Sequence, residues 1–197
     1  MDVKEGKLAV ELARHAAENF ISGKGEPPLV NFPKVFFENR GAFVTLHSYP
    51  GKELRGCIGY PEPVYPLHKA LCDCAVHACQ DSRFPPVQKS EFPKIIEEVS
   101  ILTKPEPVEC APKDYPKHVR IGQDGLIIRK GWNSGLLLPQ VATEHKFSAK
   151  EFLEHTCMKA GLAADSWLDR GCKLFKFQAE IFSEKTPGGI VEKSKKA

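Results

Sequence analysis

Apolar residues recur at helical spacing in three stretches of the chain. Over residues 3–21 they fall every three or four positions, and small alanines stand beside them, so one stripe of an amphipathic helix would face a core. The same spacing predicts a second helix over residues 67–80. Ser148 and Glu151 have the spacing of a capping box, which predicts a third helix that starts there and ends at Gly161.

Strand signals lie between these helices. Residues 42–48 are rich in β-branched and aromatic side chains, and a Pro-Gly sequence separates them from residues 54–60, which predicts a strand, a turn and a return strand. Paired strands are also predicted over residues 119–121 and 126–129, around an Asp-Gly turn. Residues 173–182 alternate polar and apolar side chains, so a final strand is predicted with one face buried and the other in water.

The order of these signals indicates an α+β fold with mostly antiparallel sheets, because helices and strands alternate without regular βαβ units and hairpins are frequent. Four prolines between residues 105 and 116 mark a subdomain boundary. We predict a larger subdomain of residues 1–110 with 145–184, in which helices flank a sheet. We also predict a smaller β-hairpin subdomain of residues 111–144 and a flexible basic tail of residues 185–197.

Composition is that of an ordinary globular protein. A chain of 197 residues can bury on the order of 70% of its unfolded-state surface, so it needs neither disulfides nor a metal to fold. Charged residues make up 27% and the net charge is only +3. Nucleic-acid binders usually gather Lys and Arg on one face, whereas the one basic cluster here lies at residues 193–196. Composition therefore disfavours nucleic acid as the main partner.

Cysteine usage and apolar run lengths bear on location. Seven cysteines form an odd set without a regular framework, which is typical of a reducing compartment. The first residues carry charges rather than the apolar region of a signal peptide, and no apolar run reaches membrane-spanning length. We therefore expect a cytoplasmic protein without a membrane role.

The sequence Leu-Arg-Gly-Cys-Ile-Gly at residues 54–59 departs most from ordinary core composition. It puts a cation, a thiol and two glycines into one predicted strand. Glycine weakens a strand, so its presence twice indicates a bulge or a close approach of another backbone or a ligand. We take this stretch as the candidate functional centre.

Further short motifs accompany it in a fixed order. They lie at residues 43–46, 54–59, 81–84, 98–102, 121–126, 136–142 and 151–153. Together they resemble the AMMECR-type domain family over nearly the whole chain. The resemblance implies a two-part α+β structure with the motif near a cleft between the parts, and it implies no established activity. It also implies a functional link to Memo-like and radical-SAM proteins, which are often encoded beside prokaryotic relatives or fused to them.

Cys57 is the candidate nucleophile. A thiol becomes reactive when a nearby cation or backbone donors favour the thiolate, and strand alternation places Arg55 on the same face. His47, on the paired strand, is the nearest candidate base. The alternative is a buried structural thiol, because free cysteine is among the most buried residue types.

Arg55 is the candidate anion-binding residue. Its planar fork of donors could hold a carboxylate or phosphate, and the glycines at Gly56 and Gly59 would leave backbone N–H groups accessible to the same ligand. The alternative is a salt bridge from Arg55 to Asp81 or Glu53. Neither alternative requires a metal or another cofactor, and we predict none.

Three more polar residues are candidates for ligand binding. Asp81 and Arg83 follow the second predicted helix and could orient a ligand, or they could form an ion pair that fixes their loop. Gln140 supplies a polar group from the second subdomain, although a solvated helix start explains it equally well. His68 and Cys72 have an i, i+4 spacing suited to two metal ligands, but no second pair completes a metal site.

These candidate residues support two classes of function. A third class, which composition disfavours, is also considered. The first is an enzyme, or enzyme component, that binds a small anionic or nucleotide-like ligand in an interdomain cleft, with Arg55 holding the anion and Cys57 reacting. The second is a non-catalytic adaptor or ligand-binding module. The third is RNA association, which predicts a steep salt dependence of binding.

Overall fold

The computed structural model describes residues 1–194. The α-helices are α1 Val3–Ile21, α2 Leu67–Ala78, α3 Tyr115–His118, α4 Pro139–Glu144 and α5 Ala149–Lys159. The strands are β1 Ala42–Ser48, β2 Leu54–Tyr60, β3 Ile95–Leu102, β4 Glu106–Pro107, β5 Gly125–Lys130, β6 Asn133–Leu137, β7 Lys173–Phe177, β8 Ala179–Glu184 and β9 Val191–Lys193. The predicted α+β class is confirmed, and α1, β1 and β2 have the predicted bounds.

The described chain forms two compact units. Unit 1 comprises Met1–Leu102 and Glu180–Ser194, and unit 2 comprises Thr103–Ala179. One five-stranded sheet has the order β2-β1-β3-β8-β9, and one four-stranded sheet has the order β4-β7-β5-β6. Antiparallel pairing joins β1 to β2 and β3 in the first sheet and also joins β8 to β9. In the second sheet, antiparallel pairing joins β5 to β6 and β7, and β4 to β7.

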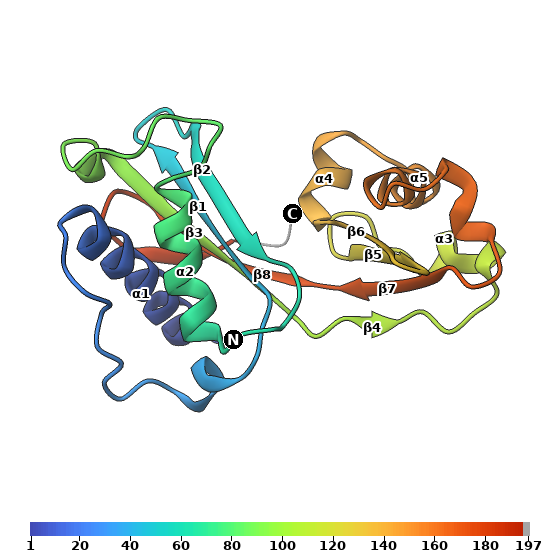
Figure 1. Cartoon of the computed structure of the whole chain (residues 1–197), viewed down its shortest axis with the longest axis horizontal. Helices are drawn as coiled ribbons and strands as arrows, with labels where there is room; N and C mark the ends of the chain where they lie inside the picture. Colours follow the sequence, from blue (N-terminus) through green and yellow to red (C-terminus); the bar gives the residue numbers. More distant parts are fainter. Residues whose placement is uncertain (195–197) are drawn as a thin grey trace. The chain divides into compact units, whose positions relative to one another are not determined.

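In unit 1, two helices cover one face of the five-stranded sheet. Figure 1 shows α1 and α2 side by side against β1 and β3, in keeping with their contacts. The helices bury a largely alanine stripe, so their backbones can approach closely, and β1 buries every second residue, Ala42, Val44 and Leu46, against them. We call this side of the sheet the helix face and the opposite side the outer face.

A buried charge cluster lies on the helix face of unit 1. Arg14 of α1 donates from Nε and Nη2 to the Glu184 carboxylate at 2.6 and 2.5 Å, and its Nη2 also donates to the Ile95 carbonyl at 2.7 Å. Glu97 of β3 lies beside this pair and is fully buried. Its backbone N–H donates to Glu184, but neither oxygen of its side chain has a hydrogen-bond partner in the described part of the chain.

Unit 2 has its own hydrophobic core. Helix α5 begins at the predicted capping box, in which the Ser148 hydroxyl and the Glu151 backbone and carboxylate bond reciprocally. It buries Phe152 and Leu153 against β5 and β6. The unit boundaries therefore differ from the predicted ones, which grouped α5 with the larger subdomain. The reason is that the apolar side chains of α5 pack on the four-stranded sheet.

Three local predictions also differ from the structure. The predicted single strand over residues 173–182 is two strands, β7 and β8, which belong to different sheets and separate at Gln178. Residues 119–121 form no strand, because Asp124 accepts the Arg120 backbone N–H at 3.0 Å and closes a turn there, so β5 pairs with β6 instead. Residues 191–193, which fall in the predicted flexible tail, form β9, while residues 195–197 lie outside the described residues.

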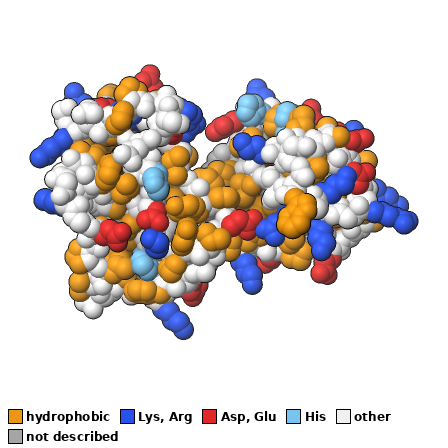
Figure 2. Space-filling model, in the orientation of Figure 1, with side chains coloured by type: hydrophobic (Ala, Val, Ile, Leu, Met, Phe, Trp, Pro, Cys, Tyr) orange, Lys and Arg blue, Asp and Glu red, His pale blue; other side chains and the backbone are white. Residues whose placement is uncertain are grey.

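Two features concern the described part of the chain as a whole. Within residues 1–194, none of the helices combines the length and the apolar character needed to cross a membrane. On the face shown in Figure 2, Lys and Arg side chains are interspersed with Asp and Glu side chains.

Candidate functional site

The strand register places three polar side chains in a row across the outer face. In the β1–β2 pair Cys57 lies opposite Thr45, and in the β1–β3 pair Thr45 lies opposite Glu98. Residues directly opposite in an antiparallel pair point to the same side of the sheet. Because Val44 and Leu46 point to the helix face, this row points to the outer face. The row therefore brings a thiol, a hydroxyl and a carboxyl together.

The first contact in this row joins the hydroxyl and the thiol. Thr45 Oγ1 donates a hydrogen bond to Cys57 Sγ at 3.2 Å. Cys57 is half-buried, whereas Cys72, Cys74 and Cys79 of the α2 region are buried, and burial raises the pKa of each of those thiols to about 12. Cys57 is therefore more accessible than the α2 cysteines, and its sulfur also accepts a hydrogen bond from a hydroxyl group.

His47 and Glu98 extend the same face. His47 follows Thr45 by two residues on β1, and its Nδ1 is buried without a hydrogen-bond partner among residues 1–194. Burial raises the pKa of the Glu98 carboxyl, and the charge of His47 acts in the opposite direction. Buried polar atoms are nearly always hydrogen-bonded, so an unpaired imidazole nitrogen calls for an explanation, and a catalytic role is one.

The β1–β2 pair has a bulge at this point, which changes two predicted relations. The register shifts between Leu46 and His47, so that His47 lies opposite Leu54 and Arg55 occupies the bulge. In the regular part of the pair before the bulge, Thr45 lies directly opposite Cys57, and the candidate base His47 lies beyond the bulge. Simple alternation also no longer relates Arg55 to Cys57, because a bulge interrupts the two-residue period of the strand.

Arg55 is engaged by a residue that the sequence did not suggest. Its Nε and Nη2 donate to the two carboxylate oxygens of Glu91 at 2.9 and 3.2 Å. This hydrogen bond from Arg55 lowers the pKa of the Glu91 carboxyl. The pairing differs from the expected alternatives, Asp81 and Glu53, and it uses the Nε and Nη2 edge of the guanidinium.

Asp81 and Arg83 do come together with Cys57. Asp81 Oδ2 accepts the Cys57 backbone N–H at 2.9 Å, and the Arg83 guanidinium donates to both oxygens of Asp81 at 3.0 and 2.6 Å. Arg83 Nη2 also donates to the Cys57 carbonyl at 3.3 Å. The hydrogen bond from Arg83 holds the pKa of the buried Asp81 carboxyl well below its usual range. These contacts fix the loop after α2 to both backbone polar groups of Cys57.

The two glycines of the motif make room for protein atoms. A Cβ at Gly56 would fall inside van der Waals contact with the carbonyl oxygen of Ala78, the last residue of α2. A Cβ at Gly59 would overlap the ring of Phe43 on the neighbouring strand. Gly56 therefore lets the end of α2 approach β2, which brings Asp81 within reach of the Cys57 N–H.

Gln140 lies in unit 2, in the first turn of α4. Its Oε1 is buried without a hydrogen-bond partner in the described chain. Its role as a ligand-binding residue stays a prediction, as does the placement of the site in an interdomain cleft. Among residues 1–194, no three His, Cys, Asp or Glu side chains lie together in an arrangement that could hold a metal ion.

The sequence did not identify Thr45, Glu98 or Glu91 as site residues. Strand alternation alone would have put Thr45 and His47 on one face of β1. Only the pairing of β1 with β3 adds Glu98 to that face, and no local pattern reveals this pairing, because residues 49–94 separate the two strands. Glu91 likewise lies in a loop without a sequence signal.

Comparisons with known proteins agree with the motifs. The family model described as AMMECR1 matches residues 10–182. Protein MJ0810 of Methanocaldococcus jannaschii is 49% identical over 196 residues, covering 98% of this chain and 97% of the relative. A protein of Methanothermobacter thermautotrophicus is 51% identical over 183 residues, covering 91% and 94% of the two chains.

A solved structure has the same fold over almost its full length. The crystal structure of the uncharacterised protein PH0010 from Pyrococcus horikoshii superposes with a TM-score of 0.88, at 44% sequence identity, and the match covers 98% of each chain. Sequence identity at this level over whole chains, together with the family model, establishes that this chain and these relatives belong to one family. The chain belongs to the AMMECR1 family.

Proposed function

We propose that this AMMECR1-family protein is an enzyme, or a component of one, that acts through the Cys57 thiol. The observation that carries the proposal is the row on the outer face, in which Thr45 donates to the half-buried Cys57 sulfur and Glu98 stands next in register. The unpaired Nδ1 of His47 supports it, because a nucleophilic thiol needs a neighbouring base.

In this proposal each side chain has a separate task. Cys57 Sγ gives its proton to His47, and the electron pair of the sulfur forms a bond to an electrophilic carbon of the substrate. The group displaced from that carbon leaves with the proton from the imidazolium. Thr45 stabilises the sulfur anion by its hydrogen bond, and Glu98 stabilises the imidazolium by its charge.

The substrate class in this proposal is a small anion. Arg83 supports that choice, because its side chain is 56% exposed and contacts the Cys57 carbonyl. An exposed guanidinium can meet a substrate carboxylate or phosphate while it stays bonded to Asp81. The seven free cysteines support a reducing compartment and hence a cytoplasmic location. The link to Memo-like and radical-SAM proteins stays a prediction from the family resemblance.

Alkylation kinetics test the role of Cys57. The full chain is treated with iodoacetamide at pH 6 to 9, and each cysteine-containing peptide is quantified by mass spectrometry. We expect His47→Gln and Thr45→Val each to slow alkylation of Cys57 about tenfold at pH 7, since each removes a group that favours the thiolate. Cys110, the other half-buried thiol, is the internal reference and should react at an unchanged rate.

A non-catalytic binding module is the second candidate, and a specific observation favours it. Arg55, Asp81 and Arg83 are all paired within the protein, and protein atoms occupy the space beside Gly56 and Gly59. The Arg and Gly residues of the motif at residues 54–59 can therefore serve to stabilise the fold rather than to bind a substrate. If Cys57 alkylates at the same rate in the parent protein and in both variants, covalent catalysis is wrong and this second candidate is preferred.

A further inference from the structure

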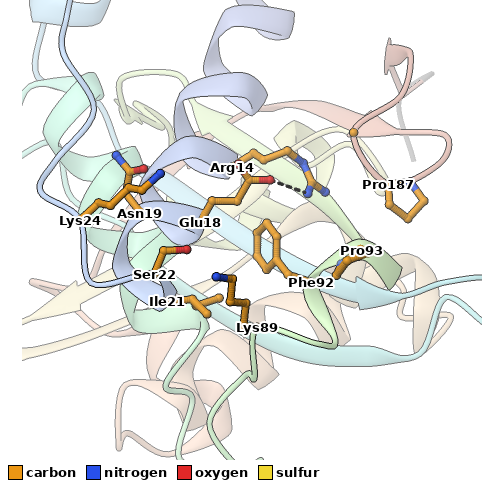
Figure 3. Close-up of a pocket in the computed structure, with 11 residues that line it drawn as sticks. Arg14, Glu18, Asn19, Ile21, Ser22, Lys24, Lys89, Phe92, Pro93 and Pro187 are labelled. Carbon is orange, nitrogen blue, oxygen red and sulfur yellow. Dashed lines mark ion pairs between the residues drawn. The ribbon is translucent and has the colours of Figure 1, made fainter.

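A cavity of about 470 Å³ opens on the helix side of unit 1, away from the outer face. Figure 3 shows its lining, which comes from the end of α1, the loop before the short helical turn Phe92–Lys94 and the loop between β8 and β9. Its volume falls in the usual range of small-molecule sites, roughly 300 to 1,000 Å³. The cavity is therefore large enough for a small organic ligand.

The floor of this cavity is an aromatic ring backed by an arginine. Phe92 and Arg14 are both buried, and the Arg14 guanidinium lies 4.9 Å from the centroid of the Phe92 ring. The strong hydrogen bonds of Arg14 go to Glu184 and to the Ile95 carbonyl. Arg14 therefore holds the ring in place, and Phe92 contributes an apolar edge to the lining of the cavity (Figure 3).

The rim of the cavity carries two free ammonium groups. Neither the Lys24 nor the Lys89 side chain has an ion-pair or hydrogen-bond partner in the part of the chain that the structure describes. The one carboxylate in the lining is that of Glu18, which stands 3.6 Å from Arg14 Nη1. The excess charge around the cavity is therefore positive.

Three of the last four carbonyls of helix α1 are already hydrogen-bonded. The carbonyls of Glu18, Asn19 and Phe20 each accept a backbone N–H from residues 22–24, at 3.0, 2.7 and 3.1 Å. Carbonyls that are already bonded attract a cation less than open ones do. The side chains of the rim therefore carry the two unpaired positive charges of Lys24 and Lys89 beside a mostly capped helix end.

We propose that this cavity binds a flat organic anion, whose ring packs on Phe92 and whose carboxylate, phosphate or sulfonate is held by Lys24 and Lys89. Pro93 and Pro187 add apolar wall to the same cavity. The chemistry is the usual one for such sites, in which apolar surface supplies affinity and a few charged groups set orientation.

The motif strand supports one wall of this cavity. Glu91 lies between Lys89 and Phe92 in the sequence, and its carboxylate is held by Arg55 and by the Gln88 backbone N–H at 2.9 Å. Arg55 is therefore a positioning residue for the cavity wall. It does not need to touch the anion.

This proposal is independent of thiol chemistry at Cys57. The cavity contains no atom of Cys57, Thr45 or His47, whose side chains belong to the outer face. Either proposal can therefore fail while the other holds.

Fluorescence titration of the full chain with a matched pair of dyes tests the anion site. The dyes are 8-anilinonaphthalene-1-sulfonate and N-phenyl-1-naphthylamine, which share the aromatic body and differ in the sulfonate. We expect one equivalent of the sulfonate to bind, and Lys24→Ala and Lys89→Ala each to weaken it about fivefold without changing the neutral dye. Phe92→Leu should weaken both dyes.

Two controls make the result decisive. Lys34→Ala removes an exposed lysine of unit 1 outside the cavity and should leave sulfonate binding unchanged. Glu91→Gln should weaken the sulfonate a few-fold and leave the neutral dye unchanged, and circular dichroism should show each variant folded. The proposal is overturned if the neutral dye binds as tightly as the sulfonate, or if neither cavity lysine affects sulfonate binding.

Discussion

At the scale of single residues, the fully buried Glu97 ties the stability of unit 1 to pH. Its carboxyl oxygens have no hydrogen-bond partner among residues 1–194, and burial raises its pKa from 4.5 to about 8. The folded state therefore holds the proton more tightly than the unfolded state does. The stability that Glu97 contributes is fully present below pH 4.5 and is lost as the pH rises towards 8.

Replacing this carboxyl by an amide should remove that pH dependence. We expect Glu97→Gln to have about the parent free energy of unfolding at pH 5 and to exceed it by on the order of 3 kcal/mol at pH 8. Urea unfolding at the two pH values measures the difference. The exposed Glu53→Gln is the control and should show no such gain. Equal effects of Glu97→Gln at both pH values would contradict the assigned protonation state.

The partners of the charged residues could not be predicted from the sequence. Arg55 was expected to bind an anion or to pair with Asp81 or Glu53, and it pairs with Glu91 because the loop after α2 returns to the motif strand. The ion pair of Asp81 with Arg83 was predictable, since the two residues are two positions apart and the helix before them ends there. Sequence spacing constrains only residues that are close in the chain, so ion-pair partners that are distant in the chain could not be predicted.

At the scale of elements, Gly56 lets the end of α2 approach β2, and Gly59 leaves room for the Phe43 ring of β1. We expect Gly56→Ala to lower the free energy of unfolding by at least about 2 kcal/mol, because its Cβ would meet the main-chain carbonyl of Ala78, which cannot move aside. Gly59→Ala meets only the Phe43 side chain, so the added change Phe43→Ala should restore part of the loss.

Double variants distinguish the main-chain contact at Gly56 from the side-chain contact at Gly59. Chemical denaturation of Gly59→Ala with and without Phe43→Ala measures the coupling, and Gly56→Ala with Phe43→Ala is the matched control. A rescue of Gly56→Ala by Phe43→Ala, or no rescue of Gly59→Ala, would show that the glycines have another role. The sequence indicated a close approach at these positions, but it could not tell whether a ligand or the protein itself makes the approach.

Predictions of elements succeeded where the signal was local. The amphipathic stripe of α1, the hairpin of β1 and β2 and the capping box of α5 each depend on residues a few positions apart. The strand over residues 173–182 was predicted as one element, because alternation continues through Gln178. Its division into β7 and β8 depends on pairing with two different sheets, which alternation does not encode.

At the scale of the whole molecule, the separate core of unit 2 leads to a prediction about autonomous folding. Residues 103–179 are one continuous segment with a buried core that includes Trp167. We expect this fragment to fold alone and to unfold cooperatively on heating, because a unit with its own core satisfies the usual criterion for a domain. Circular dichroism and tryptophan fluorescence, followed against temperature, measure the folding and the unfolding transition of this fragment.

A shorter fragment provides the control for this prediction. Residues 103–170 lack β7, the strand between β4 and β5 in the four-stranded sheet, and should not fold. If residues 103–179 are equally unfolded, the core of unit 2 needs the rest of the chain.

Local patterns in the sequence were enough to predict the α+β class and the position of most helices and strands, and ordered motifs were enough to indicate the family. These depend on composition and on spacings within one element. The folded arrangement was needed to show that Thr45 and Glu98 lie in register with Cys57, that Arg55 pairs with Glu91, and that protein atoms fill the space beside Gly56 and Gly59. Such contacts join residues far apart in the chain, and strand register and the bulge at Arg55 set them.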